Sequence, residues 1–425
     1  MRFPTPFVSA VLSCALGAAA VLACSNASPD LGEESGTEQL SSSDKNDIFS
    51  KPEAFEVKIS APLSTLFARY KAGQADPPEA DASKPGEQEF SEPAKMEFTH
   101  DGEKKILDLR VYVRGESSKN DCPFTKLKLD FADKEQLKKT PFKGHGKMRL
   151  NTHCGPGDAS ARSGMGRVFN GVGPVREELT YRLIRAAGIP TYRTRVIAVH
   201  YDDTADKSQL DTFGMLVESG DDAVQRFLKM EPPLVPEKTE YLDPNAAWSV
   251  TITPENTAQI AIAEAFSGNK DWGGTHNIDT FAVPAATTGL QIAQDFDLGA
   301  ITLGDIAHYW KGNAPVADAK TALGNATVAA AIRPTKNAME AAYKEQEKAM
   351  IAAKAIASDD GVTTTDPGFL EAKKRIAELF DLPELQAAAA VDGGADATAT
   401  TDAAPAPPAD AGKVPTVDAG ADAKK

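Results

Sequence analysis

Two aspartates stand two residues apart in the run LQIAQDFDLGA, which covers residues 290–300. The apolar and polar residues of this run follow a strand-like pattern. Side chains at positions i and i+2 of a strand point to one face, so Asp295 and Asp297 would have Cα atoms about 7 Å apart. Carboxylate oxygens at that separation suit Mg²⁺ or Mn²⁺ shared with phosphate groups. The alternative is a solvated strand end that binds nothing.

Another aspartate and an asparagine lie in the loop-like run that precedes this strand. The run NKDWGGTHNIDTF covers residues 269–281 and follows a helix stop at Gly268. If its strand and the next one pair as a hairpin, Asp271 and Asn277 would share a site with the two aspartates. The alternative is turn chemistry, because Asp, Asn and Gly are the usual residues of tight loops. An EF-hand calcium loop is disfavoured, since its bidentate glutamate is missing.

Motifs of other enzyme classes are missing from the sequence. There is no G-x-S-x-G nucleophile elbow. The glycine-rich run over residues 164–173 does not match the phosphate-binding loop G-x-x-x-x-G-K-[ST]. The sequence also lacks a basic stripe, so we expect no nucleic-acid partner.

The N-terminus has the features of an export signal. Arg2 is followed by small and apolar residues, FVSAVLSCALGAAAVLAC, which end at Cys24. Charge, length and flanks predict a signal peptide over residues 1–23 rather than a membrane-spanning helix. The last four residues, VLAC, are similar to the lipobox of bacterial lipoproteins, in which the cysteine carries the lipid. We therefore predict a lipid-anchored protein of the cell envelope, at the outer membrane, whose membrane contact is Cys24. A plain cleaved signal is the alternative.

Four cysteines occur in the chain. Cys14 would leave with the signal peptide and Cys24 would carry lipid, which leaves Cys122 and Cys154. In an oxidising envelope compartment this pair is predicted to form a disulfide. Zinc is disfavoured, because two cysteines and scattered histidines do not make a four-ligand framework.

The net charge of −15 comes mainly from three polar segments. Residues 24–53, 71–93 and 385–425 contribute −5, −4 and −3. Their compositions predict a disordered tether, a long flexible loop and a disordered tail rich in Ala, Asp and Pro. The predicted folded domain lies between tether and tail, over residues 54–384.

The predicted domain begins with strands and ends with helices. FEVKIS, FTKLKLDF and two runs around the Asp101–Gly102 turn alternate like strands. PVREELTYRLIRAAGIP has apolar residues at helical spacing between Pro174 and Gly188. Two strands, a helix, a second hairpin and two C-terminal helices follow. This order predicts an α+β fold with antiparallel hairpins.

Several of these stretches, taken in order over about residues 107–300, resemble the CotH family of spore-coat-protein-H-type kinases. LRVYVRGESS resembles its strand-to-loop element, TKLKLDF its lysine strand, and VREELTYRLIRAAGIPTYRTRVIAV its helix and following strand. GMLVES resembles a strand ending in glutamate, and the two acidic runs resemble its D-W…N and D-x-D segments. The resemblance implies an atypical protein-kinase-like fold, with a β-rich N-terminal part and a more helical C-terminal part.

The resemblance also implies catalytic and metal-binding roles. Asp271 would be the catalytic carboxylate that accepts the proton of an attacking hydroxyl. Asn277, together with Asp295 and/or Asp297, would hold Mg²⁺ or Mn²⁺ between the phosphates of ATP.

A second group of residues would contact the nucleotide. Lys126 or Lys128 would meet the phosphates, and Glu177 would be the ion-pair partner of that lysine. Arg114 and Ser117 would lie near the loop that covers the phosphates. The alternative for the lysines is the solvated face of an ordinary strand, and Glu177 lies off the apolar stripe of its helix.

The leading hypothesis is a lipid-anchored envelope protein that binds Mg-ATP through a CotH-type kinase-like domain and transfers phosphate to Ser or Thr of surface proteins. The second hypothesis is a non-catalytic surface or scaffold lipoprotein, in which the domain is a pseudokinase-like binding module. The third is a metal-dependent phosphoesterase that uses the same carboxylates. The sequence leaves open whether the chain is an enzyme.

Overall fold

The computed structural model describes the central part of the chain. It covers residues 46–73, 91–115, 121–157, 168–228, 251–267, 278–282, 288–293 and 335–381, with the single residues Ala329, Pro383 and Gln386. Within these residues, no helix combines the length and the apolar character needed to cross a membrane.

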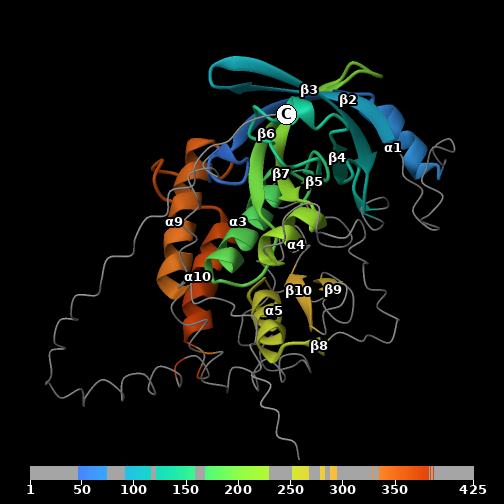
Figure 1. The fold of residues 1–425 in the computed structure, drawn as a ribbon. Coiled ribbons are helices and arrows are strands. Elements are labelled where there is room, and N and C mark those ends of the chain that lie inside the picture. Colours follow the sequence, from blue (N-terminus) through green and yellow to red (C-terminus); the bar gives the residue numbers. More distant parts are fainter. Residues whose placement is uncertain are drawn as a thin grey trace, which may run out of the picture.

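Seven strands close into a barrel in the spatial order β1, β2, β3, β4, β5, β7, β6 (Figure 1). All neighbours are antiparallel except β1 and β6, which pair in parallel from Phe55 opposite Ile197 to Ala61 opposite Asp203. That parallel pair closes the barrel. The strands are Phe55–Ala61 (β1), Ser91–His100 (β2), Glu103–Val113 (β3), Leu127–Asp130 (β4), Lys147–Asn151 (β5), Thr194–Asp203 (β6) and Gln209–Glu218 (β7).

Local turn chemistry explains the hairpin of β2 and β3. Asp101 and Gly102 have φ of 51° and 77° at its tip. Positive φ at both central residues is what a two-residue hairpin turn needs, and Asp-Gly is a favoured sequence for it. His100 stands opposite Glu103, so the predicted hairpin is confirmed. β6 and β7 also pair as an antiparallel hairpin, as predicted from their sequences.

Apolar side chains fill the interior of the barrel. Leu127 and Leu129 of β4 are fully buried, while the polar residues between and beside them point outward, as strand alternation requires. Helix α1 (Leu63–Lys71) follows β1 directly and packs apolar side chains onto this interior. Phe142 packs against Phe55 near the start of β1.

Helices cover the outer face of β6 and β7. Buried side chains of α3 pack on these strands, and the same apolar cluster continues into α5, α9 and α10 (Figure 1). The helices are α3 (Val172–Ala186), α4 (Gly220–Leu228), α5 (Pro254–Ser267), α9 (Lys336–Ala352) and α10 (Pro367–Phe380), with the short 3₁₀ helix η2 (Glu135–Leu137) before β5. The predicted helices at α3, α5, α9 and α10 are therefore confirmed.

A small three-stranded sheet lies beside α5. Its order is β8 (Thr251–Ile252), β10 (Thr288–Ala293) and β9 (Ile278–Ala282). β9 and β10 are antiparallel, which confirms the predicted hairpin of these two runs.

A buried ion pair joins α3 to α10. The Arg176 guanidinium donates to both carboxylate oxygens of Asp366, at 2.9 and 2.8 Å, and both side chains are buried. Asp366 also caps α10 by accepting from the backbone N–H groups of Gly368 and Phe369. A Cβ on Gly368 would come within 2.5 Å of Arg176 Cδ, so only glycine allows this close approach.

A charged network fixes the segment that enters the barrel. His145, in the loop before β5, contacts Asp222 of α4 at 2.8 Å and Asp47 at 3.0 Å. Arg193 bridges Asp47 and the buried carboxylate of Glu218, at 3.3 and 2.8 Å. Burial alone would lower the pKa of His145, but the two carboxylates outweigh it and raise this pKa to about 9. His145 is therefore a charged residue at neutral pH.

The predicted protein-kinase-like α+β fold is wrong. The strands were expected to form separate antiparallel hairpins, but β1 pairs in parallel with β6 and closes seven strands into a mixed barrel. The sequence pattern of a single strand does not show which distant strand it pairs with. Alternation of apolar and polar residues specifies only which face of the strand is buried. Two segment boundaries also differ: Ile48 and Phe49 of the predicted tether are buried, and residues 91–93 of the predicted loop belong to β2.

We predict that Asp366→Ala lowers the free energy of unfolding by about 3–5 kcal/mol. The substitution leaves the buried Arg176 without its carboxylate and removes the cap of α10. Denaturant unfolding followed by far-UV circular dichroism measures the change. Asp359→Ala, at an exposed position, is the control and should change stability by no more than about 0.5 kcal/mol. Equal effects of the two variants would contradict this role of Asp366.

We predict that stability falls as the pH rises from about 6.5 through 9, because His145 must then lose a proton that the fold holds. A group with a raised folded-state pKa contributes fully below its unfolded pKa and loses this contribution above its folded pKa. The shift from 6.5 to about 9 corresponds to roughly 3 kcal/mol. His145→Gln should flatten this part of the stability profile, while His200→Gln, at an exposed ion pair, should keep it. A wild-type profile that does not fall in this window would refute the prediction.

Candidate functional site

Cations gather on the outer face of β3, β4 and β5. Because the aliphatic residues of these strands point into the barrel, their alternate residues form three rows across its outside. We call these nine residues the basic face. They carry six cations and one carboxylate, in a chain of net charge −15. The rows are Arg110–Asp130–Lys147, Tyr112–Lys128–Arg149 and Arg114–Lys126–Asn151.

The third row is tied to helix α3. The N–H of Arg114 donates to the carbonyl of Lys126 at 2.9 Å, which extends the β3–β4 pairing by one step. The Arg114 guanidinium donates to the side-chain oxygen of Asn151 at 2.7 Å. Asn151 in turn donates through its amide nitrogen to a carboxylate oxygen of Glu177, also at 2.7 Å. One polar chain therefore runs from β3 over β5 to α3.

This cluster is buried although it is charged. Lys126 is 6% exposed, Glu177 is 1% exposed and Asn151 is fully buried. Burying charges is costly unless they are paired and hydrogen-bonded. Glu177 brings a buried carboxylate next to this row through Asn151, so α3 contributes a charged group to the site as well as apolar packing.

The middle row is less buried and includes an aromatic contact. The Lys128 ammonium lies 4.5 Å from the centre of the Tyr112 ring. Arg149 lies 4.6 Å from the centre of the Tyr192 ring and donates to its hydroxyl at 3.3 Å. Cation–π contacts of this kind hold long side chains in place. Lys128 and Arg149 stand opposite each other on neighbouring strands, so the row brings two cations together.

The structure brings together most of the described residues that were predicted to contact a nucleotide. Arg114 and Lys126 are neighbours, and Glu177 is linked to Arg114 through Asn151. Lys128 lies one row away on the same face. The inward position of Glu177 differs from what the apolar stripe of its helix suggested.

The remaining predicted site residues lie outside the described residues. This group contains the predicted catalytic carboxylate, the predicted metal ligands, the predicted loop serine and the predicted lipid attachment site: Asp271, Asn277, Asp295, Asp297, Ser117 and Cys24.

Sequence reasoning missed Asn151. The run KMRLN has the alternation of a short strand, with apolar Met148 and Leu150 on the inward positions. That pattern would have placed Asn151 on the same outward side as Arg149. It would not have identified the amide as the link between Arg114 and Glu177, because that role depends on how α3 packs.

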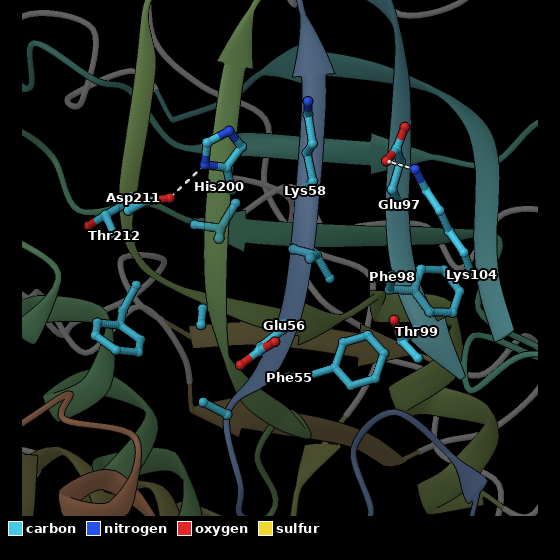
Figure 2. A pocket seen from close by; sticks show the side chains of 15 residues that line it. Phe55, Glu56, Lys58, Glu97, Phe98, Thr99, Lys104, His200, Asp211 and Thr212 are labelled. Atoms are coloured by element: carbon cyan, nitrogen blue, oxygen red, sulfur yellow. Dashed lines mark hydrogen bonds and ion pairs between the residues drawn. The ribbon is translucent and has the colours of Figure 1, made fainter. Parts of the chain in front are cut away.

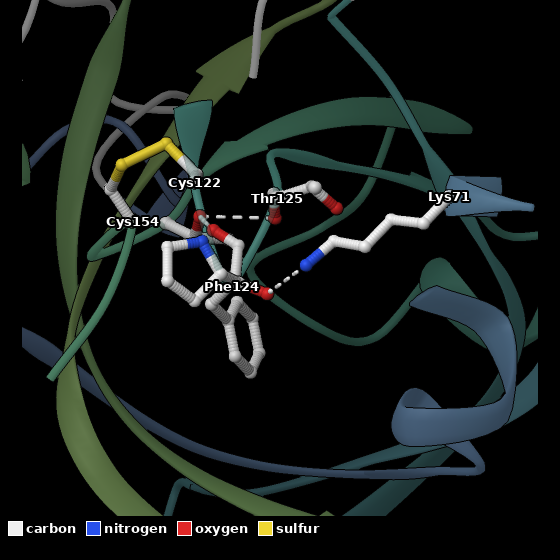
Figure 3. Close-up of a disulfide and its surroundings, with 7 residues drawn as sticks. Lys71, Cys122, Phe124, Thr125 and Cys154 are labelled. Atoms are coloured by element: carbon white, nitrogen blue, oxygen red, sulfur yellow. Dashed lines mark hydrogen bonds between the residues drawn. A yellow bond between two sulfur atoms is a disulfide. The ribbon is translucent and has the colours of Figure 1, made fainter. Parts of the chain in front are cut away.

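The two remaining cysteines are bonded next to this site. Cys122 and Cys154 have their sulfur atoms 1.94 Å apart, a bonded distance (Figure 3). Cys122 precedes β4 and Cys154 follows β5, so the bond ties the ends of two strands of the basic face. Lys71, at the end of α1, donates to the carbonyl of Pro123 at 3.3 Å beside the bond.

A concave surface lies elsewhere, on the outside of β1, β2, β6 and β7, with a volume of about 740 Å³ (Figure 2). Two pairs of its charged side chains contact each other. Glu97 contacts Lys104 at 2.7 Å, and His200 contacts Asp211 at 2.6 Å. On the basic face Lys147 lies 4.0 Å from Asp130, but the six cations outnumber this one carboxylate, so the basic face is the better candidate for an anionic ligand.

The donor set of the basic face fits an anion and not a metal ion. Ammonium and guanidinium groups bind carboxylate or phosphate oxygens, and guanidinium does so in a two-pronged geometry. Within the described part of the chain, the one group of side chains spaced for a metal ion is Asp121, Cys122 and Cys154.

Comparison with known proteins does not identify the chain. No protein-family model and no curated protein sequence matches it. The resemblance to the CotH family therefore stays a prediction that rests on the sequence motifs.

Proposed function

We propose that the basic face binds the phosphate groups of Mg-ATP, and that the chain is an envelope protein anchored through a lipid on Cys24. In this proposal the bound nucleotide donates a phosphoryl group to Ser or Thr of proteins at the cell surface. The observation that carries the proposal is the block of six cations with one carboxylate on three neighbouring strands.

The charge distribution supports a phosphate ligand. The chain as a whole carries a net charge of −15, whereas the basic face carries an excess of cations. Several cations held on one rigid sheet strengthen a shared anion site, because their positions are fixed before the ligand arrives. A triphosphate spans several ångströms and would contact more than one row.

The link between Glu177 and the third row supports a defined geometry. The Glu177 carboxylate is only 1% exposed, so it would lose its hydrogen bond from Asn151 if it turned toward solvent. Through Asn151 it holds Arg114 in one orientation. Orientation matters for phosphoryl transfer, since most of its catalysis comes from positioning and from cations.

The transfer step in this proposal follows the predicted roles. Asp271 would accept the hydroxyl proton, and Asn277 with Asp295 or Asp297 would hold the metal ions. The hydroxyl oxygen would bond to the γ-phosphorus as the bond to ADP breaks.

A non-catalytic binding module is the second candidate, and the fold favours it. The domain is a closed barrel and not the expected kinase-like fold. A barrel with a charged outer face is sufficient for binding, and fold alone does not imply chemistry.

We predict saturable binding of Mg-ATP to the full-length chain in calorimetry. Lys128→Ala, at a half-buried position of the basic face, should weaken binding at least about tenfold, because a hydrogen bond to a charged group contributes about 1.5–3 kcal/mol. Lys126→Ala, at a buried position of the same face, should weaken it as well. Lys138→Ala removes the same charge at an exposed site that pairs with Glu135 and should leave affinity unchanged.

The outcomes separate the candidate functions. Binding with ATP turnover that Asp271→Asn abolishes supports the kinase, and binding without turnover supports the module. Equal affinity for inorganic tripolyphosphate would show that the nucleoside is not recognised. No saturable binding by a folded wild-type chain would end the proposal.

A further inference from the structure

A carboxylate lies beside the disulfide of Cys122 and Cys154. Asp121 precedes the first cysteine, and one of its oxygens forms a group with the two sulfur atoms in which all members are within 4.8 Å of one another. Both cysteines are buried and Asp121 is half-buried. The group therefore combines two sulfur atoms, which are soft ligands, with one carboxylate oxygen, which is a hard ligand. Solvent reaches it in part through the half-buried Asp121.

Hydrogen bonds join the segments that carry the two cysteines, in addition to the sulfur–sulfur bond. The N–H of Phe124 donates to the carbonyl of Cys154 at 3.0 Å. The Thr152 hydroxyl lies 3.1 and 3.0 Å from the carbonyls of Phe124 and Thr125. β4 and β5 pair directly beside these contacts. Breaking the disulfide would therefore leave two thiols on segments that remain adjacent.

We propose that reduction of this disulfide creates a Zn²⁺ site, in which Cys122, Cys154 and Asp121 supply one ligand atom each. Water would complete the tetrahedral coordination, since three protein ligands and one open position form a common zinc arrangement. Two thiolates select zinc over Mg²⁺ and Ca²⁺, which prefer oxygen ligands. The proposal does not depend on nucleotide binding.

The two states exchange through a balanced two-electron reaction. A dithiol gives two electrons and two protons to the Cys122–Cys154 bond, which breaks as the dithiol closes to its own disulfide. Zn²⁺ then displaces the two thiol protons, which pass to the buffer. Exchange with an external disulfide re-forms the protein bond and releases the ion.

The disulfide form and the zinc-bound form would link the same two strand ends. Cys122 lies shortly before Lys126 in the sequence, and Cys154 lies shortly after Asn151. A disulfide or a bound zinc ion adds a direct link between these segments, and the reduced form without metal keeps only their hydrogen bonds. The loop at residues 121–125 is therefore the part that should loosen when both are removed.

Zinc titration of the full-length chain tests the proposal. Cys14→Ser and Cys24→Ser leave Cys122 and Cys154 as its two cysteines. The protein is reduced with a dithiol, freed of reductant without air, and titrated with Zn²⁺ against a coloured chelator. We expect one equivalent bound in the reduced form and none in the oxidised form. Co²⁺ should give the absorption of thiolate coordination.

Matched variants identify the ligands. Asp121→Asn should weaken zinc binding at least about tenfold, while Asp133→Asn, the same change at an exposed turn, should not alter it. A variant with both Cys122→Ser and Cys154→Ser should bind no zinc. Failure of the reduced, folded protein to bind zinc would overturn the proposal, and so would unchanged binding by the double serine variant. Circular dichroism of each form shows that it is folded.

Discussion

The barrel depends on the parallel pairing of β1 with β6, because this pair joins the first strand to the last hairpin and leaves no open sheet edge. Its partners are far apart in the chain: Ser60 and Asp202 stand opposite each other at a separation of 142 residues. Bringing such distant segments together costs loop entropy, and the apolar interior shared by all seven strands and α1 offsets that cost. Without the pair, β1 and β6 would become exposed edges that can join other chains.

Adjacent residues of α3 connect the barrel to the C-terminal helices. Arg176 reaches α10 through Asp366, and Glu177 reaches the basic face through Asn151. Both contacts are buried, so loss of Asp366 would leave the Arg176 charge without its partner, and loss of Asn151 would leave the Glu177 carboxylate without this hydrogen bond. A charged ligand at the basic face and the packing of α10 would therefore act on the same turn of one helix. This arrangement gives the C-terminal helices a structural connection to the candidate site.

Local signals in the sequence predicted local structure. The turn at residues 101–102 and the helix at residues 172–186 follow from turn chemistry and helical spacing. Closure of the barrel did not follow from such signals, because alternation in the first strand does not specify a parallel partner. The buried position of Glu177 was not expected from its place off the apolar stripe. It depends on the partner Asn151, which the sequence reading missed, since only tertiary packing brings the two side chains together.

The ion pairs around His145 lie where the chain enters the barrel. Asp47 contacts both His145 and Arg193 shortly before β1 begins. Tension applied at the N-terminus would load these contacts first and then pull β1 along its own axis. β1 is hydrogen-bonded to a neighbour on each side, so it can leave only by sliding past two strands at once. The domain should resist mechanical force from that end, and its resistance should weaken when His145 loses its proton.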